Sequence, residues 1–440
     1  MSTTAQELEA PRPSLRRPDY LLLGTTIALL VLGTLMVYSA SFVVAHNEFS
    51  DDAYFLTRQL LWVAIGSVAL VFGMTLDYHR WRSVSVVIML VCIVLLVAVL
   101  VPGIGVRSYG ASRWLRFGSL LQVQPSELAK IAIVLYLADW LARRGSLVRH
   151  FGNGLLPFAI IVTLVSGLVE IQPDLGTTSI IVGAAACVFF VAGANLLHIG
   201  MGACLGVLGA LAALSRLSGY RQDRIAAFLD PFSDIQGSGW HTAQGLIALG
   251  SGGPLGRGLG ESFQKFYWVP NAHTDAIFAI IGEELGFIGS LGVLGLFGIL
   301  AWRGFLIAFR APDAFGRLLA TGLTCMLTLQ AIVNIAVVTN SVPYTGITLP
   351  LVSFGGSSTV ISLLAVGLLL NISRFKGLQL AAEAEEEPAP AAVPEPSVRR
   401  IRRRTRAFVP HVWASNAVLR HHKALPRVGS ARRRTRKVYG

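Results

Sequence analysis

Residues 269–286 read VPNAHTDAIFAIIGEELG, and this stretch places charge inside an apolar segment of membrane length. Asp275 stands at its start, and two acids, Glu283 and Glu284, lie within it. Charge inside a membrane is costly, so such residues usually serve a function or an internal pair. Thr274 is the predicted N-cap, which would put Asp275 in the first helical turn, at the water-facing edge. The alternative role of Asp275 is to complement the helix dipole.

The composition of the whole chain fits that of a membrane protein. The 440 residues are 53% hydrophobic and only 14% charged, and the mean hydropathy is +0.62. These values exclude an ordinary soluble globule and predict a polytopic membrane protein. The first long apolar run, residues 21–44, exceeds the apolar core of a signal peptide, so we expect a span there and no cleaved leader. The four cysteines all lie in apolar runs, which predicts buried thiols rather than disulfides or a metal site.

Ten apolar segments each approach the roughly 20 residues that a membrane helix requires. The sequence therefore predicts an all-α fold with ten transmembrane helices and a long extracytoplasmic loop between spans seven and eight. The loop covers about residues 216–273 and is rich in glycine; within it, residues 240–249 are expected to form an interfacial helix with Gln244 toward water. The predicted spans are about 20–43, 57–76, 84–102, 125–142, 154–171, 175–193, 196–215, 274–302, 317–339 and 356–373.

Arginines and lysines near the segment ends set the orientation. Basic residues precede the first span, follow the tenth, and occupy alternate connections between them, which all fall on one side if ten spans are present. We therefore expect both termini in the cytoplasm and an active face outside the plasma (inner) membrane. The opposite side also holds basic residues, which are candidates for binding an anion or are ordinary solvated loop residues: Arg107, Arg113, Arg116, Arg221, Arg224, Arg257 and Lys265.

The C-terminal part changes composition abruptly. Residues 397–440 hold 14 Lys and Arg and no Asp or Glu, so the formal charge of +13 leaves 13 − 14 = −1 for the remainder. We predict four parts: a cytoplasmic N-terminal tail (1–19), a membrane domain (20–376), a disordered Ala/Glu/Pro linker (377–398) and a basic cytoplasmic tail (399–440). The basic tail is expected to lie on anionic lipid or to bind a partner protein. We expect no nucleic-acid partner, because no folded reader accompanies it.

Polar residues gather at the predicted outer membrane edge. They predict an outward-facing cavity in which an acid stands beside several cations, an arrangement suited to a substrate with a diphosphate and a hydroxyl to be deprotonated. Structural alternatives stay open: Glu127 and Lys130 fit an internal ion pair at i, i+3, and Asp174 fits a turn cap. The predicted lining residues are Arg113, Lys130, Asp174, Arg221, Arg224 and Asp275.

Eight motifs together give the chain a specific resemblance across residues 20–375. The chain resembles the SEDS family (shape, elongation, division and sporulation), which includes FtsW and RodA, and two of the motifs, GLGESFQK and IIGEELG, are more similar to FtsW. The matching motifs are MVYSAS (36–41), RQ (58–59), ASRW (111–114), QPSELAK (124–130), QPDLGT (172–177), GLGESFQK (258–265), HTDAIFAIIGEELG (273–286) and PLVSFGGSS (350–358).

The resemblance implies a peptidoglycan glycosyltransferase that polymerises lipid II during cell division. It assigns the catalytic aspartate to Asp275, here read as the general base, and functional roles to Lys130 and Arg58. The implied partners are lipid II, the growing glycan strand, membrane lipid, a class B penicillin-binding protein and other divisome proteins. A divalent cation, Mg²⁺ or Mn²⁺, is a candidate cofactor, and no organic cofactor is expected. The full set of candidate substrate-binding residues is Arg58, Arg113, Trp114, Lys130, Asp174, Arg221, Arg224, Lys265, His273 and Ser357.

Three alternatives to this function are kept. One is a RodA-like elongation polymerase with the same chemistry. A second is a lipid II flippase or transporter, which ten spans, intramembrane acids and broken segments would also suit. A third is a scaffold that only recruits division proteins, which would leave the outer acid and cations unexplained. The clustering of polar residues on one face favours the enzyme, because a transporter needs a route through both leaflets.

Overall fold

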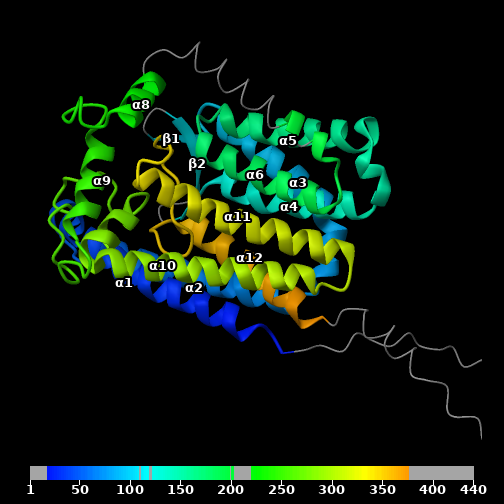
Figure 1. The fold of residues 1–440 in the computed structure, drawn as a ribbon, viewed down its shortest axis with the longest axis horizontal. Helices are drawn as coiled ribbons and strands as arrows, with labels where there is room; N and C mark the ends of the chain where they lie inside the picture. Colours follow the sequence, from blue (N-terminus) through cyan, green and yellow to red (C-terminus); the bar gives the residue numbers. More distant parts are fainter. Residues whose placement is uncertain (1–16, 109–110, 118–120, 199, 203–219, 376–440) are drawn as a thin grey trace, which may run out of the picture. The chain divides into compact units, whose positions relative to one another are not determined.

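A computed structural model provides the fold (Figure 1), and it describes residues 17–108, 111–117, 121–198, 200–202 and 220–375. Most of the described chain is helical, which confirms the predicted helical class. The helices are α1 (Tyr20–Phe49), α2 (Tyr54–Thr75), α3 (Tyr78–Leu100), α4 (Pro125–Ala142), α5 (Leu156–Glu170), α6 (Leu175–Val191), α8 (Tyr220–Leu229), α9 (Trp240–Ser251), α10 (Ile277–Phe309), α11 (Ala314–Val338) and α12 (Gly356–Arg374). A 3₁₀ turn (Gly145–Arg149) and a π turn (Phe151–Leu155) precede α5.

Seven helical stretches of the described chain are long and apolar enough to cross a membrane. They correspond to α1, α2, α3, the π turn with α5, α10, α11 and α12. Helices α4 and α6 cover the predicted spans 125–142 and 175–193, but neither is among the seven, and α6 has only 17 residues. The predicted seventh span, 196–215, lies largely outside the described residues. The count of ten spans and the position of the long loop therefore stay predictions.

A small antiparallel sheet corrects the all-α prediction. Its strands β1 (Gly105–Ser108), β2 (Ala111–Phe117) and β3 (Leu121–Val123) stand in the order β1-β2-β3 between α3 and α4. In β2 Leu115 is buried, Arg116 is exposed, and residues 112–114 are half-buried. A search for apolar windows of membrane length overlooks such a short segment.

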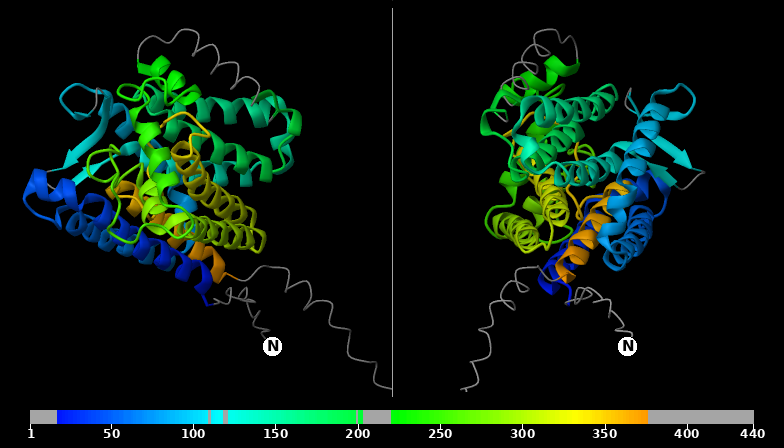
Figure 2. Two further views of the ribbon diagram at one scale, coloured as in Figure 1. Left: turned by 60° about the vertical axis from the view of Figure 1, so that its left-hand side comes forward. Right: turned by 90° about the vertical axis from the view of Figure 1, so that its right-hand side faces the viewer.

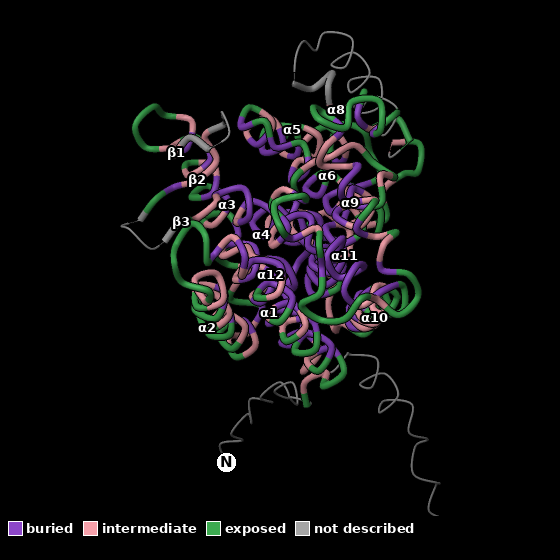
Figure 3. The backbone as a smooth tube through the Cα atoms, turned by 90° about the vertical axis from the view of Figure 1, so that its left-hand side faces the viewer, coloured by how far each residue is buried: buried purple, intermediate pink, exposed green. Residues whose placement is uncertain are grey.

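The core of the bundle is formed by α4, α11 and α12, which are the most buried long helices of the described chain (Figure 3). By contrast, none of the apolar side chains of α2 is buried, and only 22% of the most apolar window of α10 is buried inside the bundle, as expected for helices that face lipid. The segment before α12 crosses the side of α1 very closely. A Cβ on Gly33 would stand 2.5 Å from Cα of Val352, so only glycine fits there.

Helix α10 begins later than predicted and contains a kink. It starts at Ile277 after the N-cap Ala276, so the prediction that Thr274 caps the helix is wrong. Asp275 lies in the turn just before the helix and not in its first turn. The kink lies at Gly286, where φ is 69° and ψ is −166°. This left-handed backbone lies two residues after Glu284, the second acid of the apolar run.

The residues predicted to form a loop before α10 contain two helices, α8 and α9, which lie at one end of the bundle (Figures 1 and 2). The predicted helix over 240–249 is present as α9, which packs against α10 and α11. Gln244 on α9 is buried, so the prediction that it points toward water is wrong. The face of α9 that carries Gln244 packs against the bundle instead of facing water.

Candidate functional site

Asp275 is held by residues from three separate segments. Its side chain is only 8% exposed. The Thr274 hydroxyl donates to Oδ1 at 2.8 Å, and the Tyr344 hydroxyl donates to Oδ2. From α11, the Asn334 amide donates to the backbone oxygen of Asp275 at 2.8 Å and to that of Ile347 at 2.6 Å. One α11 side chain therefore joins the turn before α10 to the segment before α12, and Tyr344 belongs to that second segment.

Arg224 and His241 complete this cluster around Tyr344. The Arg224 Nη1 atom donates to the Tyr344 backbone oxygen at 3.0 Å, and its guanidinium carbon lies 5.2 Å from the centre of the Tyr344 ring. The His241 ring lies 4.2 Å from the same ring, measured between centroids. Burial lowers the pKa of His241, and nearby Asp275 only partly opposes this. In this cluster the Asp275 carboxylate accepts a hydrogen bond from Tyr344, and both the Arg224 guanidinium and the neutral His241 imidazole lie against the Tyr344 ring.

The space beside this cluster is small. A cavity of about 10 Å³, enough for about one water molecule, is lined by Tyr344, His241 and Ala276 among others. Among the described residues, no group of three His, Cys, Asp or Glu side chains is placed to hold a metal ion. The chain's described residues therefore do not fit a metal site built by protein alone, and the divalent cation stays a prediction.

Lys130 lies in a buried ion pair, as the structural alternative for this residue required. It is 1% exposed. Its Nζ atom lies 2.8 Å from Glu127 Oε2 and donates to Gln330 Oε1 at 2.7 Å. Gln330 in turn donates to the Thr348 backbone oxygen at 3.0 Å and to the Ser358 hydroxyl at 3.1 Å. This network ties α4 and α11 to the start of α12, beneath the segment that carries Tyr344.

Asp174 and Arg113 both stabilise the turn before α6. Asp174 is the N-cap of α6 and accepts from the Thr177 backbone at 3.0 Å and from Gln124 at 3.2 Å. Arg113, on β2, donates to the backbone oxygens of Gln172, at 2.8 Å, and of Pro173. The turn-cap alternative for Asp174 is thus present, and the sheet is fastened to this turn.

Two further candidates, Trp114 and Ser357, lie near this turn but do not contact Asp275 through any described bond. Trp114 is half-buried on β2. The Ser357 hydroxyl accepts from the Gln124 backbone at 3.1 Å and donates to the Gln122 backbone oxygen at 3.4 Å. The side chain of Arg221 is not among those that the structure describes.

Lys265 and the two acids of α10 fix the glycine-rich loop to the bundle. The Lys265 ammonium lies 3.3 Å from Glu284 Oε1 and donates to the Gly260 backbone oxygen. Glu284 also accepts from the Ser39 hydroxyl of α1 at 2.7 Å. Glu283 accepts from the Ser262 hydroxyl at 2.5 Å and from backbone N–H groups of the same loop. Both acids are buried and hydrogen-bonded, as expected if they are structural partners.

His273 and Arg58 lie among aromatic rings. The His273 ring is 4.4 Å from the Phe55 ring and 5.7 Å from the Phe354 ring, measured between centroids. Burial lowers the pKa of His273 to about 4, so the imidazole is neutral at physiological pH. The Arg58 guanidinium lies 4.2 Å from the centre of the Tyr54 ring. Among the candidates drawn from the sequence, Arg224 is linked to Asp275 through Tyr344, and the charge of Asp275 acts on the neighbouring His273 ring.

Three residues of the cluster are not singled out by the sequence: Tyr344, Asn334 and His241. From the sequence, the segment 343–358 is only irregular backbone that opens the last span. Irregular backbone is tolerated at membrane depth only where it is buried in protein or lines a cavity. A tyrosine in such a segment is therefore the sequence feature that could have pointed to Tyr344. Asn334 in the middle of an apolar helix is a second one.

Comparison with known proteins identifies the family. The family model described as "Cell cycle protein", for FtsW, RodA and SpoVE, matches residues 20–377. The chain belongs to this family. The family prediction is thereby confirmed, and with seven described helices of membrane length the chain is a multi-pass membrane protein.

Relatives across this FtsW/RodA/SpoVE family are similar over most of their length. Stage V sporulation protein E of Bacillus subtilis (strain 168) is 44% identical over 358 residues, which are 81% of this chain and 97% of the relative. A protein of Trichlorobacter lovleyi named probable peptidoglycan glycosyltransferase FtsW is 43% identical over 376 residues, which are 85% and 98% of the two chains.

Solved structures share the fold as well. A chain from a structure described as "Structural coordination of polymerization and crosslinking by a peptidoglycan synthase complex" is 30% identical, with a TM-score of 0.67, over 81% of this chain and 98% of that chain. The rod shape determining protein RodA of Thermus thermophilus is 30% identical, with a TM-score of 0.61, over 81% and 97%. The family's fold therefore extends over the part of the chain that carries the Asp275 cluster.

Proposed function

We propose that the protein is a peptidoglycan glycosyltransferase that polymerises lipid II, with Asp275 as the general base. The enzyme class is the one stated in the names of the FtsW relatives. The observation that carries the role of Asp275 is its hydrogen bond from Tyr344, whose ring and backbone also contact Arg224. A buried carboxylate beside a cation suits a reaction that removes a proton and releases an anion.

The proposed step is a direct displacement at the donor sugar. Asp275 takes the proton of the acceptor sugar hydroxyl, and the oxygen attacks the anomeric carbon of the donor. The bond from that carbon to the diphosphate oxygen breaks, and the electron pair leaves with undecaprenyl diphosphate, inverting the anomeric centre. General base catalysis supplies roughly 10²–10⁴ in rate. Because a diphosphate leaves without protonation, a second carboxylic acid is not needed, in contrast to glycosidases.

Arg224 is the cation that we assign to the leaving diphosphate. It lies beside Tyr344, the hydrogen-bond partner of Asp275. Lys130 contacts Glu127 and Gln330, and Arg113 contacts the backbone of the turn before α6, and none of these groups forms a described bond with Asp275. For Lys130 we therefore assign a positioning role, because its network supports the start of α12 and the segment before it.

Orientation and partners belong to the same proposal. Asp275 precedes the first residue of α10, and Arg303, near the other end of this 33-residue helix, forms an ion pair with Asp19 before α1. Asp275 and the start of the described chain therefore lie at opposite ends of α10, as expected for cytoplasmic termini and an extracytoplasmic active face. A class B penicillin-binding protein is the proposed partner, and the similarity to a chain of a complex that joins polymerization to crosslinking supports it. Septal work during division is favoured over a RodA-like role by the FtsW relatives.

The test compares the enzyme with the transporter alternative. The full-length protein is reconstituted in vesicles with fluorescent lipid II and its transpeptidase partner, and two products are followed: glycan polymer, and lipid II moved between leaflets. We expect polymer from the wild type and a large loss of it in Arg224→Gln. Movement of lipid II without polymer would support the transporter instead.

A further inference from the structure

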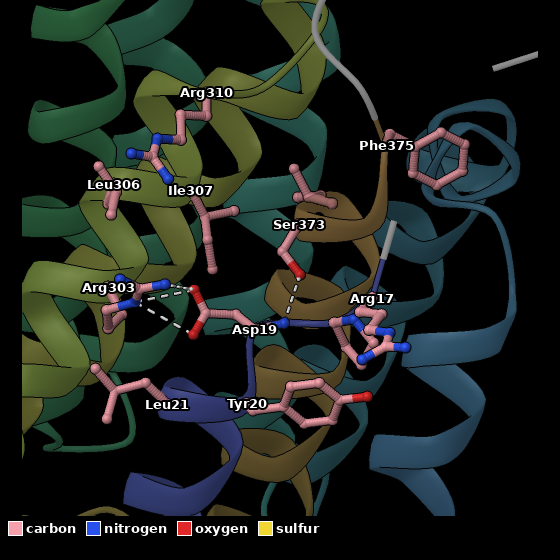
Figure 4. Close-up of a pocket in the computed structure, with 12 residues that line it drawn as sticks. Arg17, Asp19, Tyr20, Leu21, Arg303, Leu306, Ile307, Arg310, Ser373 and Phe375 are labelled. Carbon is pink, nitrogen blue, oxygen red and sulfur yellow. Dashed lines mark hydrogen bonds and ion pairs between the residues drawn. The ribbon is translucent and has the colours of Figure 1, made fainter. Parts of the chain in front are cut away.

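A second cavity lies away from Asp275, at the other end of α10. It has a volume of about 350 Å³ and is formed where α1 begins and where α10 and α12 end (Figure 4). Its polar lining consists mainly of Arg17, Asp19, Arg303 and Arg310. The lining contains three arginines and one aspartate, so its formal charge is 3 − 1 = +2.

The aspartate is already neutralised within the fold. Arg303 Nε lies 2.9 Å from Asp19 Oδ2, and Nη2 binds the same oxygen. Asp19 Oδ1 also caps α1 by accepting from the Leu22 backbone at 3.0 Å. By contrast, the side chains of Arg17 and Arg310 are exposed and form no hydrogen bond or ion pair with any described residue. Two cations at the cavity are therefore available to an anion.

The surroundings of the cavity are amphipathic. Leu21, Leu306 and Ile307 line its apolar side. On the neighbouring surface Tyr20 is 63% exposed and Trp302 is 58% exposed. Exposed aromatic rings at the ends of membrane helices are typical of the level of the lipid headgroups. Cations above an apolar wall at this level match a phospholipid, with the phosphate on the arginines and the acyl chains along Leu21 and Trp302.

We propose that this cavity, the Arg17–Arg310 pocket, binds the phosphate headgroup of an anionic membrane phospholipid. Basic pockets between membrane helices are known to bind such headgroups. The pocket lies at the end of the bundle opposite to Asp275, so the proposal does not depend on the proposed enzymatic function. A free phosphate ion shares the headgroup chemistry but would make no use of the apolar side.

The test measures lipid binding to the purified full-length protein in detergent by native mass spectrometry. Phosphatidylglycerol and phosphatidylcholine are titrated separately onto the wild type and onto Arg17→Gln/Arg310→Gln. We expect the first phosphatidylglycerol to bind about 25-fold more weakly to the double variant, since each arginine near an anionic headgroup contributes about fivefold. Arg303 is left intact because it holds Asp19, so the fold of the variant is retained.

Two controls make the result decisive. Arg403→Gln/Arg404→Gln removes the same charge from the basic tail and should leave the first binding event unchanged. Equal weakening in both double variants, or no preference of the wild type for phosphatidylglycerol over phosphatidylcholine, would overturn the proposal. Inorganic phosphate added at the same concentration should not displace the lipid; displacement would show that a free anion is the ligand. An unchanged thermal unfolding midpoint without lipid verifies that the pocket variant is folded.

Discussion

The Tyr344 hydroxyl donates a hydrogen bond to Oδ2 of Asp275, although the two residues lie 69 positions apart in the chain. This contact joins the turn before α10 to the irregular segment before α12, and Asn334 of α11 holds the backbone of both. The carboxylate is therefore aimed by three elements of the bundle. A group whose orientation is fixed in this way is suited to act at a defined substrate atom.

Removal of the Tyr344 hydroxyl tests this orientation. In Tyr344→Phe the ring stays beside Arg224 and His241, but the bond to Asp275 is lost. A hydrogen bond to a charged group contributes about 1.5–3 kcal/mol, so we expect kcat for lipid II polymerisation to fall about tenfold or more, with KM little changed. The matched control is Tyr54→Phe, which makes the same change next to Arg58. Equal kcat in Tyr344→Phe and the wild type would show that the contact has no role in catalysis.

The buried Lys130–Glu127 pair is predicted to be structural. Lys130→Met leaves the Glu127 carboxylate buried without its cation, which costs about 3–5 kcal/mol of unfolding free energy. The double variant Glu127→Gln/Lys130→Met removes both charges and should recover at least half of that loss. Thermal unfolding in detergent measures both. If the double variant is no more stable than the single one, the pairing does not account for the burial of Lys130.

The close approach of α1 to the segment before α12 gives a prediction with a control in the same helix. In Gly33→Ala the new methyl group meets backbone atoms of Leu351 and Val352 at 2.5–2.8 Å, which cannot yield as a side chain would. We expect a loss of about 2 kcal/mol in stability, and lower polymerisation because the segment carries Tyr344. Gly24→Ala has nothing within 4 Å of its Cβ and should be neutral. Similar unfolding midpoints for the two variants would contradict the packing.

The low pKa of His273 predicts a dependence of stability on pH. The pKa is about 4 in the fold and 6.5 ordinarily, so between these values the unfolded chain binds more protons than the folded one. The contribution of His273 is thus fully present above about pH 6.5 and is lost as the pH falls toward 4, with a slope of up to about 1.4 kcal/mol per pH unit. In His273→Gln the unfolding midpoint should fall less steeply over this range. The same slope in both proteins would mean that His273 is not buried in its neutral form.

Local sequence patterns predicted the parts of the fold that depend on local physics. Helix α4 begins at Pro125 as predicted, with Glu127 and Lys130 one turn apart, and α12 begins at Gly356 as predicted. These starts depend on proline geometry and on apolar length. The kink at Gly286 was not predictable, because the glycine-rich loop packs on α10 there. The later start of α10 was not predictable either, because the turn before the helix is held by Asn334 and Phe354, which are distant in the chain.

The site could be predicted only in part, for the same reason. Asp275 stood out as a charge at the edge of an apolar segment. Its partners Tyr344 and Asn334 are distant in the chain and meet it through tertiary packing alone. Lys130 and Asp174 also stood out, but the contacts that make them structural, with Gln330 and Gln124, join different helices and connections.

The central claim is that the Asp275 carboxylate is the base that activates the acceptor hydroxyl. The most direct measurement is glycan polymerisation from purified lipid II by Asp275→Asn, with the transpeptidase partner present, beside the control Asp174→Asn. Asparagine keeps the size of the side chain but cannot accept the proton, so we predict that Asp275→Asn inserts into the membrane normally and forms no polymer, while the control keeps substantial activity. Near-normal polymer from a correctly inserted Asp275→Asn protein would contradict the account.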